Sequence, residues 1–168
     1  MDLATITAIC IELESELTGR RFGKIFQLSK TDIAVDFRLL DSRHLFVSVE
    51  PGNPRIYLMK RRLRDLEKVS GTPATFSLIL RKQLSGAELS SVTQIDGERV
   101  LLFGFIAEDD LGATVDRTLA VQLTGASANL FLLDSERRIM DSARQTLGRG
   151  QQIGEIYEPP ERRVESSR

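Results

Sequence analysis

Two carboxylates and a guanidinium, those of Asp96, Glu98 and Arg99, fall within four residues of the chain. The Asp-Gly that begins this group is typical of a tight turn, and the stretches on either side, 89–95 and 100–106, are rich in strand-forming residues. A guanidinium held at the start of a strand by a neighbouring carboxylate has its donors aimed, which suits a phosphate or the edge of a base. The other interpretation is a hairpin turn tightened by a local ion pair, and the residues alone leave both open.

Two further cations, Arg81 and Lys82, fall in the last turn of a helix that apolar spacing predicts over 75–84. Cations at this end of a helix complement the negative pole of its dipole, and this alone can account for them. The alternative is that they form one wall of a basic pocket. Because one strand separates them from Arg99 in sequence, we expect the three cations to form a single basic surface.

The basic stretch 60–68, KRRLRDLEK, has two interpretations that remain open: a solvated short helix or connector, or a contact to nucleic acid or the ribosome. The remaining reactive side chains favour no catalysis. Cys10 and His44 are single examples of their kind, and no nucleophile–base–acid set can be assembled around them. We therefore expect no enzymatic activity, no cofactor and no metal.

The elements that must position these residues predict an α+β fold that is mainly β. Strands with alternating polar and apolar residues and short polar turns indicate antiparallel sheets with one solvated face. We expect a β-sandwich or pseudobarrel of about nine short strands capped by two helices. The expected helices are 2–17 and 75–84, with a short one over 60–68; the expected strands are 20–28, 33–38, 45–49, 55–59, 89–95, 100–106, 118–123, 129–133 and 139–143, with a hairpin loop over 108–117.

Length and composition favour one domain. A chain of 168 residues can bury one substantial core, and no apolar period continues after Gln145. We therefore expect a domain over 1–157 that folds as a monomer and a linker or disordered tail over 158–168. No apolar run is long enough to span a membrane, which favours a cytoplasmic protein. The net charge of −1 means that any nucleic-acid binding must depend on local clusters of cations.

Several segments, taken in order, resemble one known family. ELESELTGRRFGKIFQ is similar to its first helix and strand, PRIYL to its fourth strand, and LRKQL followed by QIDGERVLLF to its central helix and next strands. ANLFLLD resembles a later strand, and GEIY with the following Pro-Pro resembles the segment that leaves the domain. The whole set resembles the amino-terminal domain of the NFACT family, also known as fibronectin-binding protein A. That resemblance implies a fold similar to the amino-terminal sandwich of MutM-like DNA glycosylases.

The resemblance also implies a function: noncatalytic binding of tRNA and of the large ribosomal subunit carrying peptidyl-tRNA. In the family this serves the rescue of stalled ribosomes and carboxy-terminal tailing of nascent chains. It implies RNA-binding roles for Glu98 and Arg99, which stand at the family's Asp-Arg pair, and for Asn129, which keeps the asparagine of its Gly-Arg-x-Ser-Asn motif. Arg81, Lys82 and Asp96 are the other RNA-binding candidates. The alternatives are a fibronectin-binding or adhesin-like module, implied by the family name only, and a DNA-lesion binder by analogy of fold.

This chain departs from the family pattern at three positions. Gln83 stands where a histidine is usual, Glu98 replaces an aspartate, and Ala126 replaces the arginine of the motif. Because the second and third positions belong to the predicted RNA contacts, these departures bear on tailing activity more than on ribosome association.

Overall fold

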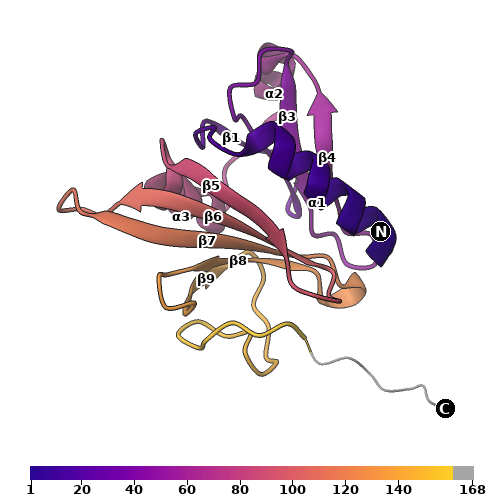
Figure 1. The fold of residues 1–168 in the computed structure, drawn as a ribbon. Helices are drawn as coiled ribbons and strands as arrows, with labels where there is room; N and C mark the ends of the chain where they lie inside the picture. Colours follow the sequence, from indigo (N-terminus) through magenta and orange to yellow (C-terminus); the bar gives the residue numbers. More distant parts are fainter. Residues whose placement is uncertain (161–168) are drawn as a thin grey trace.

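A computed structural model of the chain describes residues 1–160 and contains two antiparallel sheets (Figure 1). The two sheets do not join into a closed barrel, so of the two predicted architectures the sandwich is present. The first sheet has the order β1 (Ile25–Gln27), β2 (Asp32–Val35), β3 (Arg43–Ser48) and β4 (Arg55–Lys60). The second has the order β5 (Glu88–Gln94), β6 (Val100–Glu108), β7 (Thr114–Gln122), β8 (Asn129–Leu133) and β9 (Ile139–Ser142). The predicted mainly-β α+β fold with nine strands is confirmed.

Two helices close the open sides of the sandwich, as predicted. Helix α1 (Leu3–Leu17) packs against the edge strands β4 and β5, and its N-cap Asp2 accepts a hydrogen bond from the amide of Thr5. Helix α3 (Thr75–Leu84) lies against β1, β6 and β9 on the other side. The shorter helix α2 (Leu63–Val69) lies on the outer face of the first sheet, where its Leu66 packs in one cluster with Phe26.

The main core lies between the sheets, because alternate residues of each strand point inward. Leu45 and Val47 of β3 face Leu101 and Phe103 of β6 across this layer.

Backbone hydrogen bonds between the two sheets are more numerous at one end of the sandwich than at the other. Residues 19–22 and 86–89, called the linked end below, exchange four such bonds of 2.8–2.9 Å. At the other end of the sandwich one backbone bond, from Gly52 N to Gly125 O at 3.2 Å, joins the loops of the two sheets within the described residues.

The segment 145–158 is folded although it has no apolar period, and the prediction places all of it except residue 158 within the domain. It folds back over the outer face of the second sheet (Figure 1), where Tyr157 is 8% exposed and packs on Phe131. The segment is attached by backbone bonds, such as Tyr157 N to Arg137 O at 2.9 Å, and not by a periodic apolar face. A periodic apolar face can be recognised in the sequence, whereas attachment by backbone hydrogen bonds cannot. Of the predicted tail over 158–168, residues 161–168 lie outside the described residues.

Several strand boundaries also differ from expectation, among them the end of β2, which lies at Val35 within the predicted strand 33–38. Strand β1 covers only Ile25–Gln27 of the predicted strand 20–28, because the preceding residues belong to the linked end. The predicted loop over 108–117 is a turn of five residues, since β6 and β7 extend to Glu108 and from Thr114. Polar residues at the ends of this long hairpin pair through the backbone alone, which hydropathy does not reveal. No helix in the described part of the chain combines the length and the apolar character needed to cross a membrane.

Candidate nucleic-acid interface

The turn 96–99 is held by its backbone from both sides. Gly97 has φ +72°, the left-handed conformation that a tight turn requires and glycine adopts without strain. Glu98 donates its amide to Ile95 O at 2.9 Å, and its carbonyl accepts from the side chain of Gln94 at 3.0 Å. The carbonyl of Arg99 accepts from Leu123 N at 2.8 Å. The backbone beneath the Arg99 side chain is therefore fixed.

The side chain of Arg99 is exposed and differs from expectation in its surroundings. No described carboxylate lies within ion-pairing distance of its guanidinium, so the predicted Glu98–Arg99 ion pair is not formed. Glu98 is half-buried and lies close enough to Tyr157 to contribute, after burial, to the raised pKa of that phenol. Asp96 is exposed at the first position of the turn.

Three loops meet where the turn lies, and residues 50–54, 95–99 and 123–128 are called the loop end below. The turn contacts the third loop through Leu123, and that loop contacts the first through the bond between Gly52 and Gly125. The third loop contains a single 3-10 turn, η1 (Gly125–Ser127). In Figure 1 the loop end lies on the right, next to the amino terminus of α1. Loops held in this way on two packed sheets are a usual place for binding residues.

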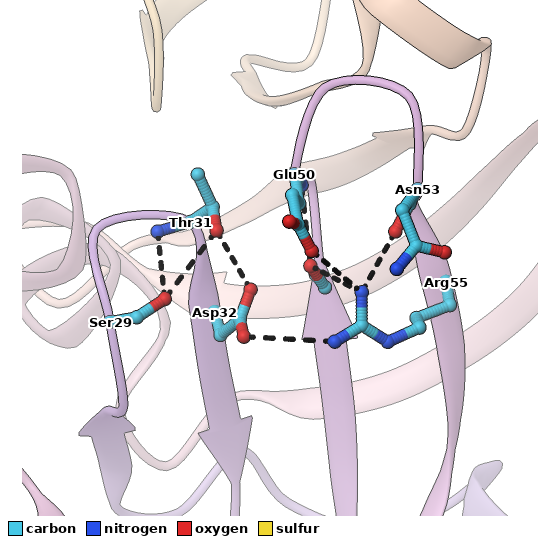
Figure 2. A network of polar contacts seen from close by, with 7 residues as sticks. Ser29, Thr31, Asp32, Glu50, Asn53 and Arg55 are labelled. Atoms are coloured by element: carbon cyan, nitrogen blue, oxygen red, sulfur yellow. Dashed lines mark hydrogen bonds and ion pairs between the residues drawn. The ribbon is translucent and has the colours of Figure 1, made fainter.

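Arg55 fixes the first of these loops (Figure 2). One guanidinium nitrogen donates to Asn53 O at 2.8 Å and to a carboxylate oxygen of Glu50 at 3.1 Å, and the other lies 4.0 Å from Asp32. The guanidinium also lies over the ring of Phe46, 5.4 Å from its centre. Sequence reasoning did not single out Arg55. The signal was a loop of two prolines and a glycine bounded by Glu50 and an arginine.

Asn129 does not present its side chain to solvent. It is fully buried, and its carboxamide oxygen accepts from the amides of Leu130 at 2.8 Å and Arg144 at 2.9 Å, while its nitrogen donates to Arg144 O at 2.8 Å. Arg144 in turn donates from its guanidinium to Ala128 O at 2.5 Å. Asn129 therefore supports the η1 loop from beneath, and any effect on bound RNA would be indirect.

Arg81 and Lys82 lie away from the loop end. Both are exposed in the last turn of α3, which leads through Gly86 of the linked end into the start of β5. Arg99 follows the opposite end of β5, and seven residues of extended chain span about 20 Å. The predicted single basic surface of Arg81, Lys82 and Arg99 is therefore wrong, because one strand in sequence is the length of the sheet in space. The cations form two separate groups.

The described residues contain no cluster of three or more His, Cys, Asp or Glu side chains arranged to hold a metal ion. A cavity of about 380 Å³ opens beside the loop end, between η1 and the segment 145–158. Its lining combines the polar side chains of Ser127, Thr146 and Gln151 and the ion pair of Arg149 and Glu158 with the apolar surface of Pro159 and Pro160.

These features define a class of protein: an α+β sandwich domain that presents an exposed arginine on a fixed turn at its loop end. The chain belongs to the NFACT family, since the family described as NFACT N-terminal and middle domains matches residues 2–166.

Three curated relatives illustrate the similarity. The Rqc2 homolog RqcH of Streptococcus suis is 32% identical over 133 residues, covering 78% of this chain and 23% of that protein. RqcH of Bacillus subtilis is 24% identical over 130 residues, covering 77% and 22%. Ribosome quality control complex subunit 2 of Saccharomyces cerevisiae is 32% identical over 149 residues, covering 88% and 13%. The chain thus spans less than a quarter of the length of these relatives.

Two solved structures share the fold. The N-terminal domain of the fibronectin-binding protein PavA of Streptococcus pneumoniae has a TM-score of 0.82 and 26% identity, covering 95% of this chain and 61% of that one. The N-terminal part of the fibronectin/fibrinogen-binding protein of Streptococcus suis has a TM-score of 0.81 and 28% identity, covering 94% and 60%.

Proposed function

We propose that this chain is a noncatalytic RNA-binding domain that engages tRNA and the large ribosomal subunit in ribosome quality control. Family membership and the relatives named for ribosome quality control support this role. One observation of the chain itself carries the proposal. The Arg99 guanidinium is exposed, lacks an ion pair within the described residues, and stands on a turn whose backbone is fixed.

The state of Arg99 in the free protein favours binding to a ligand. An arginine engaged in a surface ion pair must first break that pair, whereas Arg99 has no described pair to break. The fixed turn limits the entropy lost when the side chain is ordered on a ligand. A planar guanidinium can donate two parallel hydrogen bonds to a phosphate or to a base edge. Arg99 therefore suits the backbone or a single base of a folded RNA.

The other predicted RNA-binding residues contribute to the proposed binding in different ways. Asp96 and Glu98 flank the contact, where carboxylates accept hydrogen bonds from exocyclic amines of bases but repel phosphates. Arg81 and Lys82 form a second group at the far end of the second sheet, which a large RNA can reach separately. The same proposal includes large subunits that carry peptidyl-tRNA as the partner, carboxy-terminal tailing of nascent chains as the process, and the cytoplasm as the location.

Arg99→Ala tests the proposal. One charge-assisted contact of about 1–3 kcal/mol predicts a loss of one to two decades in affinity for tRNA or large subunits at fixed salt. The melting temperature should stay within about 1 °C, since no ion pair of a described residue is lost. Binding would be measured by cosedimentation with large subunits and by fluorescence anisotropy with labelled tRNA. Arg137→Ala, at an exposed turn near the other end of the second sheet, is the matched control.

The result that contradicts the assignment is unchanged RNA affinity with a lowered melting temperature, which would make Arg99 structural. Fibronectin binding, taken from the names of similar structures, is a separate outcome of the same experiment. A chain that binds immobilised fibronectin, and neither large subunits nor tRNA, would overturn the proposal in favour of the adhesin-like alternative.

A further inference from the structure

Helix α2 and the residues before it carry a further group of cations, separate from Arg99 and from Arg81 and Lys82. Lys60, Arg61, Arg62, Arg64 and Lys68 are all exposed, and they are called the α2 basic surface below. The burial of Leu66 beneath the helix, at 1% exposure, fixes how the helix is rotated. With 100° per residue, Arg64 and Lys68 then point directly away from the sheet, one turn apart. The side of α2 that faces solvent is therefore basic.

The α2 basic surface makes no ion pair within the described residues, whereas Lys24 and Arg43 do. Lys24 Nζ lies 2.7 Å from a carboxylate oxygen of Glu67, which belongs to α2. Arg43 pairs with Asp41 and Glu16. Glu67 is thus already engaged on the side of the helix, which leaves Asp65 as the exposed carboxylate of α2 without an ion pair in the described structure.

The position of the arginines is unfavourable for folding. Arg61 and Arg62 precede the first residue of α2, where the positive pole of the helix dipole and the neighbouring cations repel them. Arg62 is the N-cap residue and its side chain makes no capping hydrogen bond. A solvated connector needs no such arrangement, and local rules are broken without a structural gain mainly at functional sites.

We propose that the α2 basic surface is an additional RNA contact, which binds the phosphate backbone of a folded RNA independently of Arg99. The inference rests on the proposed function for its partner class. Figure 1 shows α2 at the far side of the first sheet, well away from the loop end, so the two contacts require a ligand larger than a short oligonucleotide. Because phosphate contacts carry no sequence information, this surface contributes affinity and orientation while Arg99 supplies the candidate base contact.

A membrane surface is the other anionic partner of basic helices, and the packing of α2 argues against it. An interfacial helix inserts a broad apolar face into the lipid. On α2 the central apolar residue, Leu66, is buried against the first sheet, and the exposed apolar residues, Leu63 and Val69, lie one at each end of the helix and form no continuous face. Arginine forks with a buried apolar face suit phosphates of RNA better than lipid insertion.

The test removes three of the cations with Arg61→Gln, Arg62→Gln and Arg64→Gln in one chain. Each phosphate contact contributes about 0.7–0.9 to the slope of log affinity against log salt, so the slope for bulk tRNA should fall by roughly 2–3. Relative to 1 M salt, the loss in affinity at 0.15 M salt is about fourfold per contact, or roughly 60-fold for three. The melting temperature should stay the same or rise by about 1–3 °C, because repelled charges are removed.

A matched control removes the same charge elsewhere, with Arg20→Gln, Lys30→Gln and Arg137→Gln at exposed positions outside α2. It should keep affinity within about threefold. Asp65→Asn, which cannot remove a cation contact, should strengthen binding a few-fold without affecting the fold.

The outcomes separate the two proposals. If the wild-type chain binds tRNA, Arg99→Ala weakens it and the triple α2 variant does not, the inference fails and the proposed function stands. If the wild-type chain binds neither tRNA nor large subunits, both fail. Equal losses in the control and the α2 variant, or a large fall in melting temperature in the α2 variant with no gain from Asp65→Asn, would overturn the inference. So would binding to phosphatidylserine vesicles that the α2 variant loses while it keeps tRNA.

Discussion

Tyr157 joins the segment 145–158 to the second sheet through a buried polar network. Its hydroxyl donates to Gln122 Oε1 at 2.7 Å, and the carboxamides of Gln122 and Gln151 bond to one another at 3.0 and 3.2 Å. Gln122 also donates to Ser127 O of η1 at 2.7 Å. The same carboxamide therefore supports the loop end and anchors the segment. A buried network of this kind is stable only while each of its members keeps its partner.

The pKa of Tyr157 predicts a specific alkaline instability. Burial, and secondly the carboxylate of Glu98, raise the pKa of its phenol above the usual value of about 10. Above that pH the unfolded chain loses this proton and the folded chain keeps it, so the free energy of unfolding falls as pH rises. Urea denaturation between pH 8 and 11 measures this slope, and Tyr157→Phe should flatten it relative to wild type. Parallel curves for the two proteins would contradict the assignment.

At the residue scale the sequence predicted which side chains are exposed better than what they contact. The exposure of Arg81, Lys82 and Arg99 follows from polarity, and the structure agrees. The fully buried Asn129 could not be recognised, because its partner Arg144 is 15 residues away and lies beyond a hairpin turn. Hydrogen bonds to a distant backbone leave no periodic trace in the sequence.

Among the elements, the segment 145–158 depends on two glycines with positive φ. Gly150 has φ +73°, and a Cβ there would lie 2.6 Å from Glu158 Cβ and 2.9 Å from Glu158 N. Gly154 has φ +91°, with nothing within 4 Å of the same position. The two sites have a similar backbone restriction and differ in the space available.

Alanine at the two glycines should therefore give unequal losses. Gly154→Ala should lower the free energy of unfolding by about 1–2 kcal/mol, from the left-handed backbone alone. Gly150→Ala should lower it by about 1–3 kcal/mol more, because backbone and Glu158 must also move. Urea denaturation measures both, and limited proteolysis should cut the segment faster in Gly150→Ala. Equal losses would mean that the segment adapts to the added methyl group.

The strands themselves were predictable even where the structure buries both of their faces, as it does for β2 and β3. Alternate apolar residues in 33–37 and 45–49 indicate the position and the inward face of these strands. The continuous apolar runs of β6 and β8 carried a further signal. Runs without alternation indicate burial on both faces, and the element that covers the outer face of these strands is the segment 145–158. The sequence thus contained evidence of a cover, although nothing in the covering segment indicates that it is one.

For the molecule as a whole, the sequence predicted the number of strands and the two capping helices, while the relative positions of the cations required the structure. Arg81 and Arg99 are 18 positions apart and belong to consecutive elements, yet the length of β5 separates them. Residues at opposite ends of a strand are far apart in space, whereas residues on either side of a tight turn are close together. Any RNA that contacts both cations must therefore follow the second sheet from end to end.

The unequal links between the two sheets have a consequence for how the molecule opens over time. Within residues 1–160, four backbone bonds hold the sheets at the linked end, and one holds them at the loop end. The two sheets should therefore separate transiently at the loop end, where Arg99 lies, while the linked end keeps them together. The amide of Gly52 should exchange with deuterium at least about 100-fold faster than the amide of Phe22, and bound tRNA should slow Gly52 while leaving Phe22 unchanged. Comparable protection of the two amides in the free protein would instead describe a sandwich that unfolds only as a whole.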